Sequence, residues 1–164
     1  MSRSFCFVTL FAATLMLAAS TVALAQSDPA AVVKQHIDAI ARGDVAGALA
    51  LYADDAVIDG HGPGGPCSAA PCVGKAAIQK ELERRVAAHQ RGTILKTYVS
   101  GNVVTFRNEQ RNDVTQKAGV ERTIGWAIWE MKGDKISSTR GAPERTDPQT
   151  ARFLEWQRTQ PPAK

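Results

Sequence analysis

The stretch AVVKQHIDAIARGDVAGALALYADDAVIDGHGPGG, residues 31–65, carries most of the information about the fold. The pair Asp28-Pro29 just before it has the residue types of a helix cap and a first helical position. From Val33 to Ile40, apolar residues recur at the i, i+3, i+4, i+7 spacing of one helix face. The pattern therefore predicts a helix that ends at Gly43 and places His36 on its buried side.

The second half of this stretch predicts a short helix, a strand and a loop. Asp44 is typical of a helix cap, and the apolar residues from Val45 to Tyr52 predict the helix that it begins. Ala56 to Asp59 has the β-branched composition of a strand, and the glycines and prolines between residues 60 and 74 predict a loop. We interpret the acid pair Asp54-Asp55 as the end of the helix and not as a catalytic pair.

The rest of the chain changes its apolar period from near four to two. A third helix is predicted over about 75–91, with Ile78, Leu82 and Val86 inward and Glu81, Glu83, Arg84 and Arg85 in solvent. Strands are predicted over 93–99, 103–111, 120–131 and 135–140. Asp147-Pro148 predicts the start of a last helix. Helices followed by long antiparallel strands indicate one α+β domain, residues 26–147, with a C-terminal helix and tail over 148–164.

The first 25 residues predict a signal peptide. Arg3 is their only charge, an apolar run follows it, and Ala23-Leu24-Ala25 fits an A-x-A cleavage site. A membrane anchor is the alternative, but no basic stop-transfer cluster follows the apolar run. We therefore expect an exported protein, periplasmic or secreted, with no membrane contact after cleavage before Gln26.

Charge gives little reason to expect a nucleic-acid partner. The whole chain has a formal net charge of +4, and removal of the signal segment leaves +3. Basic residues alternate with acidic ones and form no stripe. The composition therefore does not indicate nucleic-acid binding.

Two cysteines, Cys67 and Cys72, remain after cleavage. In an oxidising compartment such a pair is expected to form a disulfide. A metal site is the alternative, but a C-x4-C pair needs further ligands and the chain has only three histidines. We expect a disulfide that shapes the loop, and neither a metal nor a cofactor.

Residues 31–65, together with VGKAAIQKELERR at residues 73–85, resemble the nuclear transport factor 2-like superfamily, in particular its SnoaL-like and ketosteroid isomerase branches. This resemblance implies a cone: a strongly curved antiparallel sheet wrapped around three N-terminal helices, with an apolar pocket at one end. It leaves the function open, because the superfamily contains isomerases, cyclases, hydratases, dehydratases and members that only bind ligands or partners.

Ketosteroid isomerase pairs a carboxylate base with an oxyanion hole made of a tyrosine and a protonated aspartic acid. When the isomerase motif is aligned with this sequence, the position of its tyrosine corresponds to His36. The base falls on Gly60, with Asp59 just before it, and the neutral aspartic acid falls on Trp126 or Ala127. The sequence resembles the isomerase in shape and departs from it at all three catalytic positions.

The candidate residues follow from this placement. We expect a small apolar molecule as ligand; the candidate catalytic residues are His36, Asp59 and His61, and the candidate ligand-binding residues are Trp126, Tyr52 and Ile128. Trp126 is expected to face inward and Trp129 to pack elsewhere. The simpler alternatives are a core histidine at 36, a loop-capping acid at 59 and an exposed histidine at 61.

The alternative function is a non-catalytic module that forms a homodimer through the open face of its sheet.

Overall fold

The computed structural model describes residues 28–60, 65–67 and 70–160, and within them it confirms the predicted α+β class. The predicted signal peptide, residues 1–25, and His61 lie outside this part of the chain. The helices are α1 (Pro29–Arg42), α2 (Val45–Ala50), α3 (Lys75–Ala87), α4 (Asp113–Lys117) and α5 (Pro148–Arg158). The strands are β1 (Tyr52–Asp59), β2 (Cys72–Val73), β3 (Arg91–Ser100), β4 (Val103–Arg111), β5 (Thr123–Lys132) and β6 (Lys135–Pro143).

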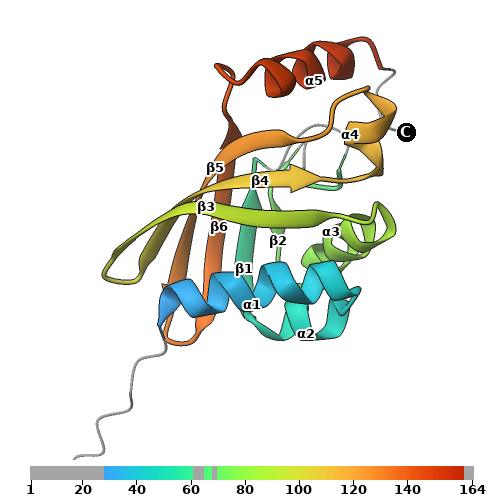
Figure 1. Cartoon of the computed structure of the whole chain (residues 1–164). Helices are drawn as coiled ribbons and strands as arrows, with labels where there is room; N and C mark the ends of the chain where they lie inside the picture. Colours follow the sequence, from blue (N-terminus) through green and yellow to red (C-terminus); the bar gives the residue numbers. More distant parts are fainter. Residues whose placement is uncertain (1–27, 61–64, 68–69, 161–164) are drawn as a thin grey trace, which may run out of the picture.

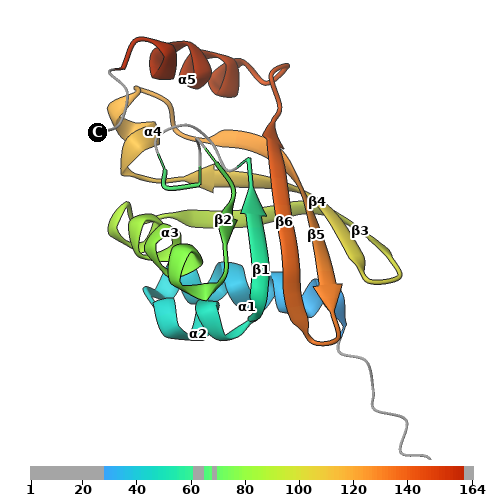
Figure 2. The same ribbon diagram turned by 180° about the vertical axis from the view of Figure 1, so that it is seen from behind.

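The strands form one curved sheet in the order β2-β1-β6-β5-β4-β3 (Figure 1). β1 and β6 run parallel, and the other neighbouring pairs of this sheet are antiparallel. α1 and α2 lie at one end of the sheet and α5 lies across the opposite end, as both Figure 1 and Figure 2 show. The predicted cone is therefore present, with α5 added at the end away from α1.

The register of β4 and β5 decides which side chains face the core. The inner face of the sheet carries the buried side chains Val104, Phe106, Ala127 and Trp129. The outer face carries the partly exposed side chains Thr105, Arg107, Trp126 and Ile128. α1 packs against β3 and β4, and α3 packs against β1 and β2, so the core lies between these helices and the inner face.

The ends of α1 follow the sequence pattern. The side chain of Asp28 accepts a hydrogen bond of 3.0 Å from the backbone N–H of Ala30, and Pro29 occupies the first helical position. Gly43 ends the helix with a φ of 78°, a conformation that costs glycine little because it has no Cβ. His36 lies on the buried side of α1, with 2% of its surface exposed.

Three local predictions are corrected. Tyr52 is the first residue of β1 and not part of α2, so the pair Asp54-Asp55 lies inside a strand. These exposed acids pair with lysines, Asp54 with Lys75 at 2.7 Å and Asp55 with Lys132 at 3.3 Å. Two short elements were also missed, β2 and α4, because two or five residues are too few to show a period.

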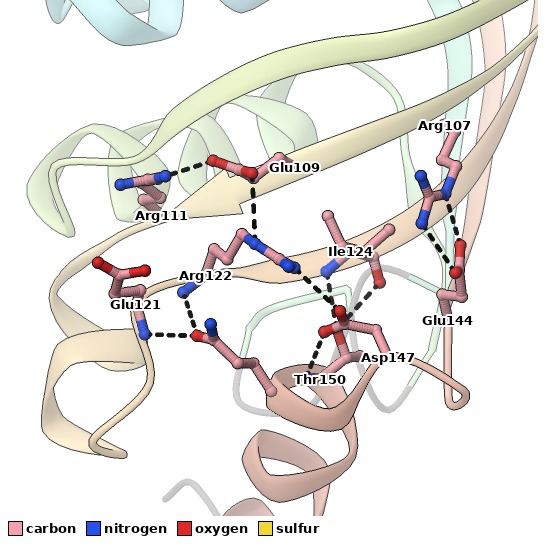
Figure 3. A network of polar contacts seen from close by, with 10 residues as sticks. Arg107, Glu109, Arg111, Glu121, Arg122, Ile124, Glu144, Asp147 and Thr150 are labelled. Carbon is pink, nitrogen blue, oxygen red and sulfur yellow. Dashed lines mark hydrogen bonds and ion pairs between the residues drawn. The ribbon is translucent and has the colours of Figure 1, made fainter.

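The N-terminus of α5 is fixed to the sheet by the polar network in Figure 3. The Asp147 carboxylate caps α5 by accepting a bond of 2.9 Å from the Thr150 N–H, and it pairs with Arg122 at 3.1 Å. The Thr150 hydroxyl accepts a bond of 2.8 Å from the Ile124 N–H of β5. These contacts hold α5 over one end of the sheet. None of the helices in the described part of the chain is long and apolar enough to cross a membrane.

Candidate functional site

A cleft of about 690 Å³ opens between α3, α4, α5 and the inner face of the sheet. A smaller chamber of about 40 Å³ reaches from it toward α1, where it is lined by His36 and Trp129. The residues that line both spaces are Arg85, Gln90, Asn108, Gln110 and Ala127. The two spaces therefore adjoin, and the smaller one lies on the side of α1.

The deep end of the site is an aromatic and imidazole cluster. His36 Nε2 lies 3.1 Å from the Tyr52 hydroxyl, and both residues are almost completely buried. The indole of Trp129 meets the His36 ring edge-on, with 4.9 Å between the ring centres. Three elements position this cluster, because His36 comes from α1, Tyr52 from β1 and Trp129 from β5.

Burial raises the pKa of Tyr52 to about 12, and the positive charge of Arg85 offsets part of that effect. Tyr52 is therefore a neutral phenol at ordinary pH. If it donates its O–H to His36 Nε2, the ring proton of the neutral imidazole sits on Nδ1. In this arrangement Tyr52 orients His36, and the imidazole is the member of the pair that lines the chamber.

The α3 wall of the cleft holds a buried ion cluster, Glu81, Arg84 and Arg85. Arg84 donates to Glu81 through two bonds of 2.9 and 2.7 Å, and Arg85 Nε donates to Glu81 Oε1 at 2.8 Å. Glu81 is fully buried, and the Arg85 side chain is 6% exposed. Each additional charge-assisted bond offsets part of the cost of removing Glu81 from water.

Burial alone would raise the pKa of Glu81, and it is the largest single effect on this carboxyl. The hydrogen bond from Arg84 and the positive charges of Arg85 and Arg84 together outweigh it, so the pKa of Glu81 lies below its ordinary value. Glu81 is therefore an anion inside the protein. It acts as the fixed counter-ion that keeps the two guanidinium groups at the wall of the cleft.

Gly65, which precedes the disulfide in the sequence, lies against this cluster. The structure joins Cys67 and Cys72 in a disulfide with a Cα–Cα distance of 5.0 Å. A Cβ on the nearby Gly65 would come within 2.8 Å of Glu81 Oε2, closer than real contacts allow. Gly65 therefore lies in close contact with the ends of the Glu81 and Arg84 side chains. The predicted pairing of Cys67 with Cys72 is confirmed.

The structure brings together two of the predicted site residues, His36 and Tyr52. Asp59 is exposed at the end of β1, on the opposite face from the fully buried Ile58, and is not brought to His36. His61 lies outside the described residues, and the proposed roles of both residues stay predictions.

The predicted orientation of the tryptophans is corrected. Trp126 lies on the outer face, where it stacks on Tyr98 with 6.3 Å between ring centres, although it also borders the cleft. Trp129 is the tryptophan that contacts His36. Ile128 shares the outer face with Trp126, because Ala127 and Trp129 on either side of it face inward.

The prediction that Glu81 and Arg85 lie in solvent is wrong. Both are buried, while Glu83 is exposed as expected. Ile78, Glu81, Leu82 and Arg85 have the i, i+3, i+4, i+7 spacing of one helix face, so the period contained the signal. Their charge hid it, since charged residues are seldom fully buried unless they are paired.

Comparison with protein families gives one match over most of the described chain. The family described as "SnoaL-like domain" matches residues 33–139. These residues begin within α1, contain α2, α3, α4 and most of the sheet, and end within β6. A search of curated protein sequences finds no match.

Solved structures share the fold at low sequence identity. A nuclear transport factor 2-like protein of unknown function from Cytophaga hutchinsonii is 11% identical, with a TM-score of 0.57 over 72% of this chain and 91% of that one. A putative polyketide cyclase from Sinorhizobium meliloti is 18% identical, with a TM-score of 0.56 over 68% and 94%. The epoxide hydrolase/cyclase-like enzyme SalBIII, which has a role in pyran ring formation in the polyether salinomycin, is 17% identical, with a TM-score of 0.59 over 73% and 92%. This level of likeness shows a common fold.

Proposed function

Because the chain belongs to the SnoaL-like domain family, we propose that it binds a small, mainly apolar molecule between α3, α5 and the inner face of the sheet. One observation carries the proposal: the 690 Å³ cleft leads to a chamber lined by His36 and Trp129. Ligand pockets in proteins are typically about 300–1,000 Å³, mostly apolar, with a few convergent polar groups. Phe153 and Leu154 of α5 and Ile124 of β5 supply apolar wall.

The proposed chemistry is proton transfer by His36 to or from the bound molecule. The neutral Tyr52 fixes the imidazole from behind, while His36 lines the chamber that the ligand would reach. An imidazole held within hydrogen-bond reach of a reacting atom can act as a general acid or base. The putative cyclase and SalBIII, with the same fold, are compatible with such a role, but their identities are too low to specify a reaction.

Binding is tested with N-phenyl-1-naphthylamine, a neutral apolar dye that becomes fluorescent in apolar sites. We expect saturable binding and energy transfer from Trp129, whose indole faces the chamber. Ala127→Phe fills the space between the cleft and the chamber and should remove binding. Ile128→Phe is the matched control, because it adds a comparable ring on the outer face of the same strand. Equal binding by both variants would contradict the proposal.

The catalytic part is tested on the natural ligand. Native mass spectrometry of the protein gently purified from a periplasmic extract, compared with the denatured sample, gives the mass of any retained molecule. With that molecule in hand, His36→Gln should keep its binding and lose its conversion, while Tyr52→Phe should reduce conversion less. Unchanged conversion in His36→Gln would show that His36 is only a core residue.

The outer face of the sheet supports a second candidate function, a homodimeric interaction module. Tyr98 is 50% exposed and stacks on Trp126, and Thr105 of β4 lies between Tyr98 and Ile128 on the outer face. Such a surface is typical of an interface core, where aromatic residues are enriched. We expect sedimentation at micromolar concentration to give a dimer that Tyr98→Lys dissociates. A dimer that binds no dye would favour this function over the first.

We also propose that the protein is exported, with cleavage before Gln26. The Cys67–Cys72 disulfide supports this, because such bonds persist in oxidising compartments. Fractionation of cells that produce the full chain, followed by N-terminal sequencing, should find Gln26 as the first residue outside the cytoplasm. A cytoplasmic chain that keeps Met1 would contradict it.

A further inference from the structure

Given the proposed binding function, on which this inference rests, we propose that the ligand carries one anionic oxygen group on its apolar body. Arg85 binds that group, and Asn108 donates a further hydrogen bond to it. The chemical class is a monoanionic amphiphile of small size, such as an apolar carboxylate, phenolate or sulfonate. The inference rests on three observations: the free donors of Arg85, the free amide of Asn108 and the charge of the cleft.

Arg85 has more hydrogen-bond donors than partners. A guanidinium has five N–H groups, and in the described part of the chain Arg85 uses one of them, Nε–H, in its bond to Glu81. The four N–H groups on its terminal nitrogens have no acceptor among those residues, yet the side chain is only 6% exposed. Arg85 lines both the cleft and the chamber, so its side chain borders the space where a ligand would lie.

Asn108 is the second buried group of this kind. It is 6% exposed, it lines both spaces, and its side-chain amide has no hydrogen-bond partner among the described residues. Gly125 stands opposite it on β5 and adds no side chain, which leaves room beside the amide. A buried polar group without a protein partner is unusual, since such groups are normally satisfied by protein, water or ligand.

The charge of the cleft selects an anion over a cation or a neutral molecule. The charged side chains that line it in the described structure are four arginines and one glutamate: Arg84, Arg85, Arg145, Arg158 and Glu81. Glu81 already pairs with Arg84 and Arg85, so it neutralises one of these two charges and leaves the other for a ligand. Planar guanidinium groups bind carboxylate-like oxygens in a two-bond fork, which fits a monoanion at Arg85.

The experiment compares two dyes that share one skeleton. N-Phenyl-1-naphthylamine is neutral, and 1-anilinonaphthalene-8-sulfonate is the same molecule with a sulfonate added. We expect the wild-type protein to bind the sulfonate at least about tenfold more tightly than the neutral dye, as charge-assisted bonds to a buried guanidinium imply. Arg85→Gln should remove this preference by weakening the binding of the sulfonate much more than that of the neutral dye. Arg85→Lys keeps the charge without the fork and should lose part of the preference.

The controls separate this site from general attraction of an anion. Arg152→Gln removes an exposed arginine of α5 that does not line the cleft, and it should leave the preference intact. Asn108→Leu should weaken the sulfonate alone, and it tests the inference even if Arg85→Gln does not fold. Equal affinities of the two dyes for wild type, or equal losses in Arg85→Gln and Arg152→Gln, would overturn the inference while the pocket stands. If neither dye binds, the proposed function itself fails.

Discussion

Two clusters of arginines and carboxylates lie at opposite sides of this molecule, and they differ in how completely they are paired. In Figure 3, the Arg107 guanidinium makes two bonds of 2.7 and 2.9 Å with Glu144 on the outer side of the sheet. Its neighbour Arg122 joins Glu109 and Asp147 at 3.5 and 3.1 Å. In the buried cluster on α3, Arg85 makes one bond and keeps four donors without a protein partner in the described chain.

The same residue types therefore perform different tasks. The ion pairs of the outer network hold the end of α5 to β4 and β5. Because these pairs are close to water, each contributes modestly to the free energy of unfolding. The α3 cluster is buried beside a cleft, where an unmatched donor is costly and a matching ligand is correspondingly favoured. Unpaired donors in a buried place, more than the number of charges, distinguish the candidate binding site from the scaffold.

The largest expected effect comes from Glu81→Ala. This change leaves Arg85 buried without its counter-ion, and breaking a buried pair from one side typically costs about 3–5 kcal/mol. Urea unfolding followed by circular dichroism measures the loss in the free energy of unfolding. Glu83→Ala, on the exposed side of the same helix, is the control and should change it by less than about 0.5 kcal/mol. Similar losses of unfolding free energy in both variants would mean that the buried Glu81 contributes no more to stability than the exposed Glu83.

Lowering the pH tests the difference between the buried cluster and the outer network with a smaller expected loss of stability. The pKa values of Glu81, Glu144 and Asp147 all lie below their ordinary values of 4.5, 4.5 and 3.8. A lowered folded-state pKa gives a stabilisation that is complete above the ordinary pKa and is lost as the pH falls through the folded-state value. We expect the free energy of unfolding to decline as the pH falls below about 4.5, and less steeply in Glu81→Gln. A slope unaltered by Glu81→Gln would contradict the buried anion.

Asp147→Ala removes the cap of α5 and the partner of Arg122. Loss of an N-cap typically costs about 1 kcal/mol, with a range of roughly 0.5–2. Because α5 forms one wall of the cleft, the affinity for the neutral dye should fall as well. Glu155→Ala, at an exposed position of α5, is the control for both measurements. If Asp147→Ala destabilises the protein without changing dye affinity, α5 is not a wall of the binding site.

The smallest effect is expected for Arg107→Gln. The Arg107–Glu144 pair is partly exposed, and surface pairs of this kind contribute little. The variant should unfold at nearly the same urea concentration as wild type and keep its preference for the sulfonate dye. A loss of that preference would place the anion site on the outer network and not at the buried Arg85.

Much of the fold was predictable because local chemistry determines it. Asp28, Gly43 and Asp147 are cap residues whose side chains or backbone freedom suit a single place at a helix end, and each occupies that place. The face of Trp126 was mispredicted, because family alignment could not choose between two adjacent positions. The register of β4 and β5 determines the face. Val104 and Phe106 face inward, and their partners across the ladder are Trp129 and Ala127, so Trp126 faces outward.

The candidate site was predicted only in part. The burial of His36 was predicted from an apolar helix face, a local signal, and its candidate role came from the resemblance to ketosteroid isomerase. Arg85 and Glu81 were missed because burial of a charge depends on partners that only the three-dimensional structure supplies. Asn108 gave no signal at all, since a single amide in a strand is common, and its meaning comes from the cleft beside it.

The most direct test of the central claim is nitrogen-detected NMR of the arginine side chains during a titration with 1-anilinonaphthalene-8-sulfonate. We predict that the Arg85 signals shift and that exchange of its terminal N–H protons with water slows, while the signals of Arg107 and Arg122 stay in place. Shifts of Arg107 or Arg122 as large as those of Arg85, or an Arg85 signal that does not respond at saturation, would contradict it.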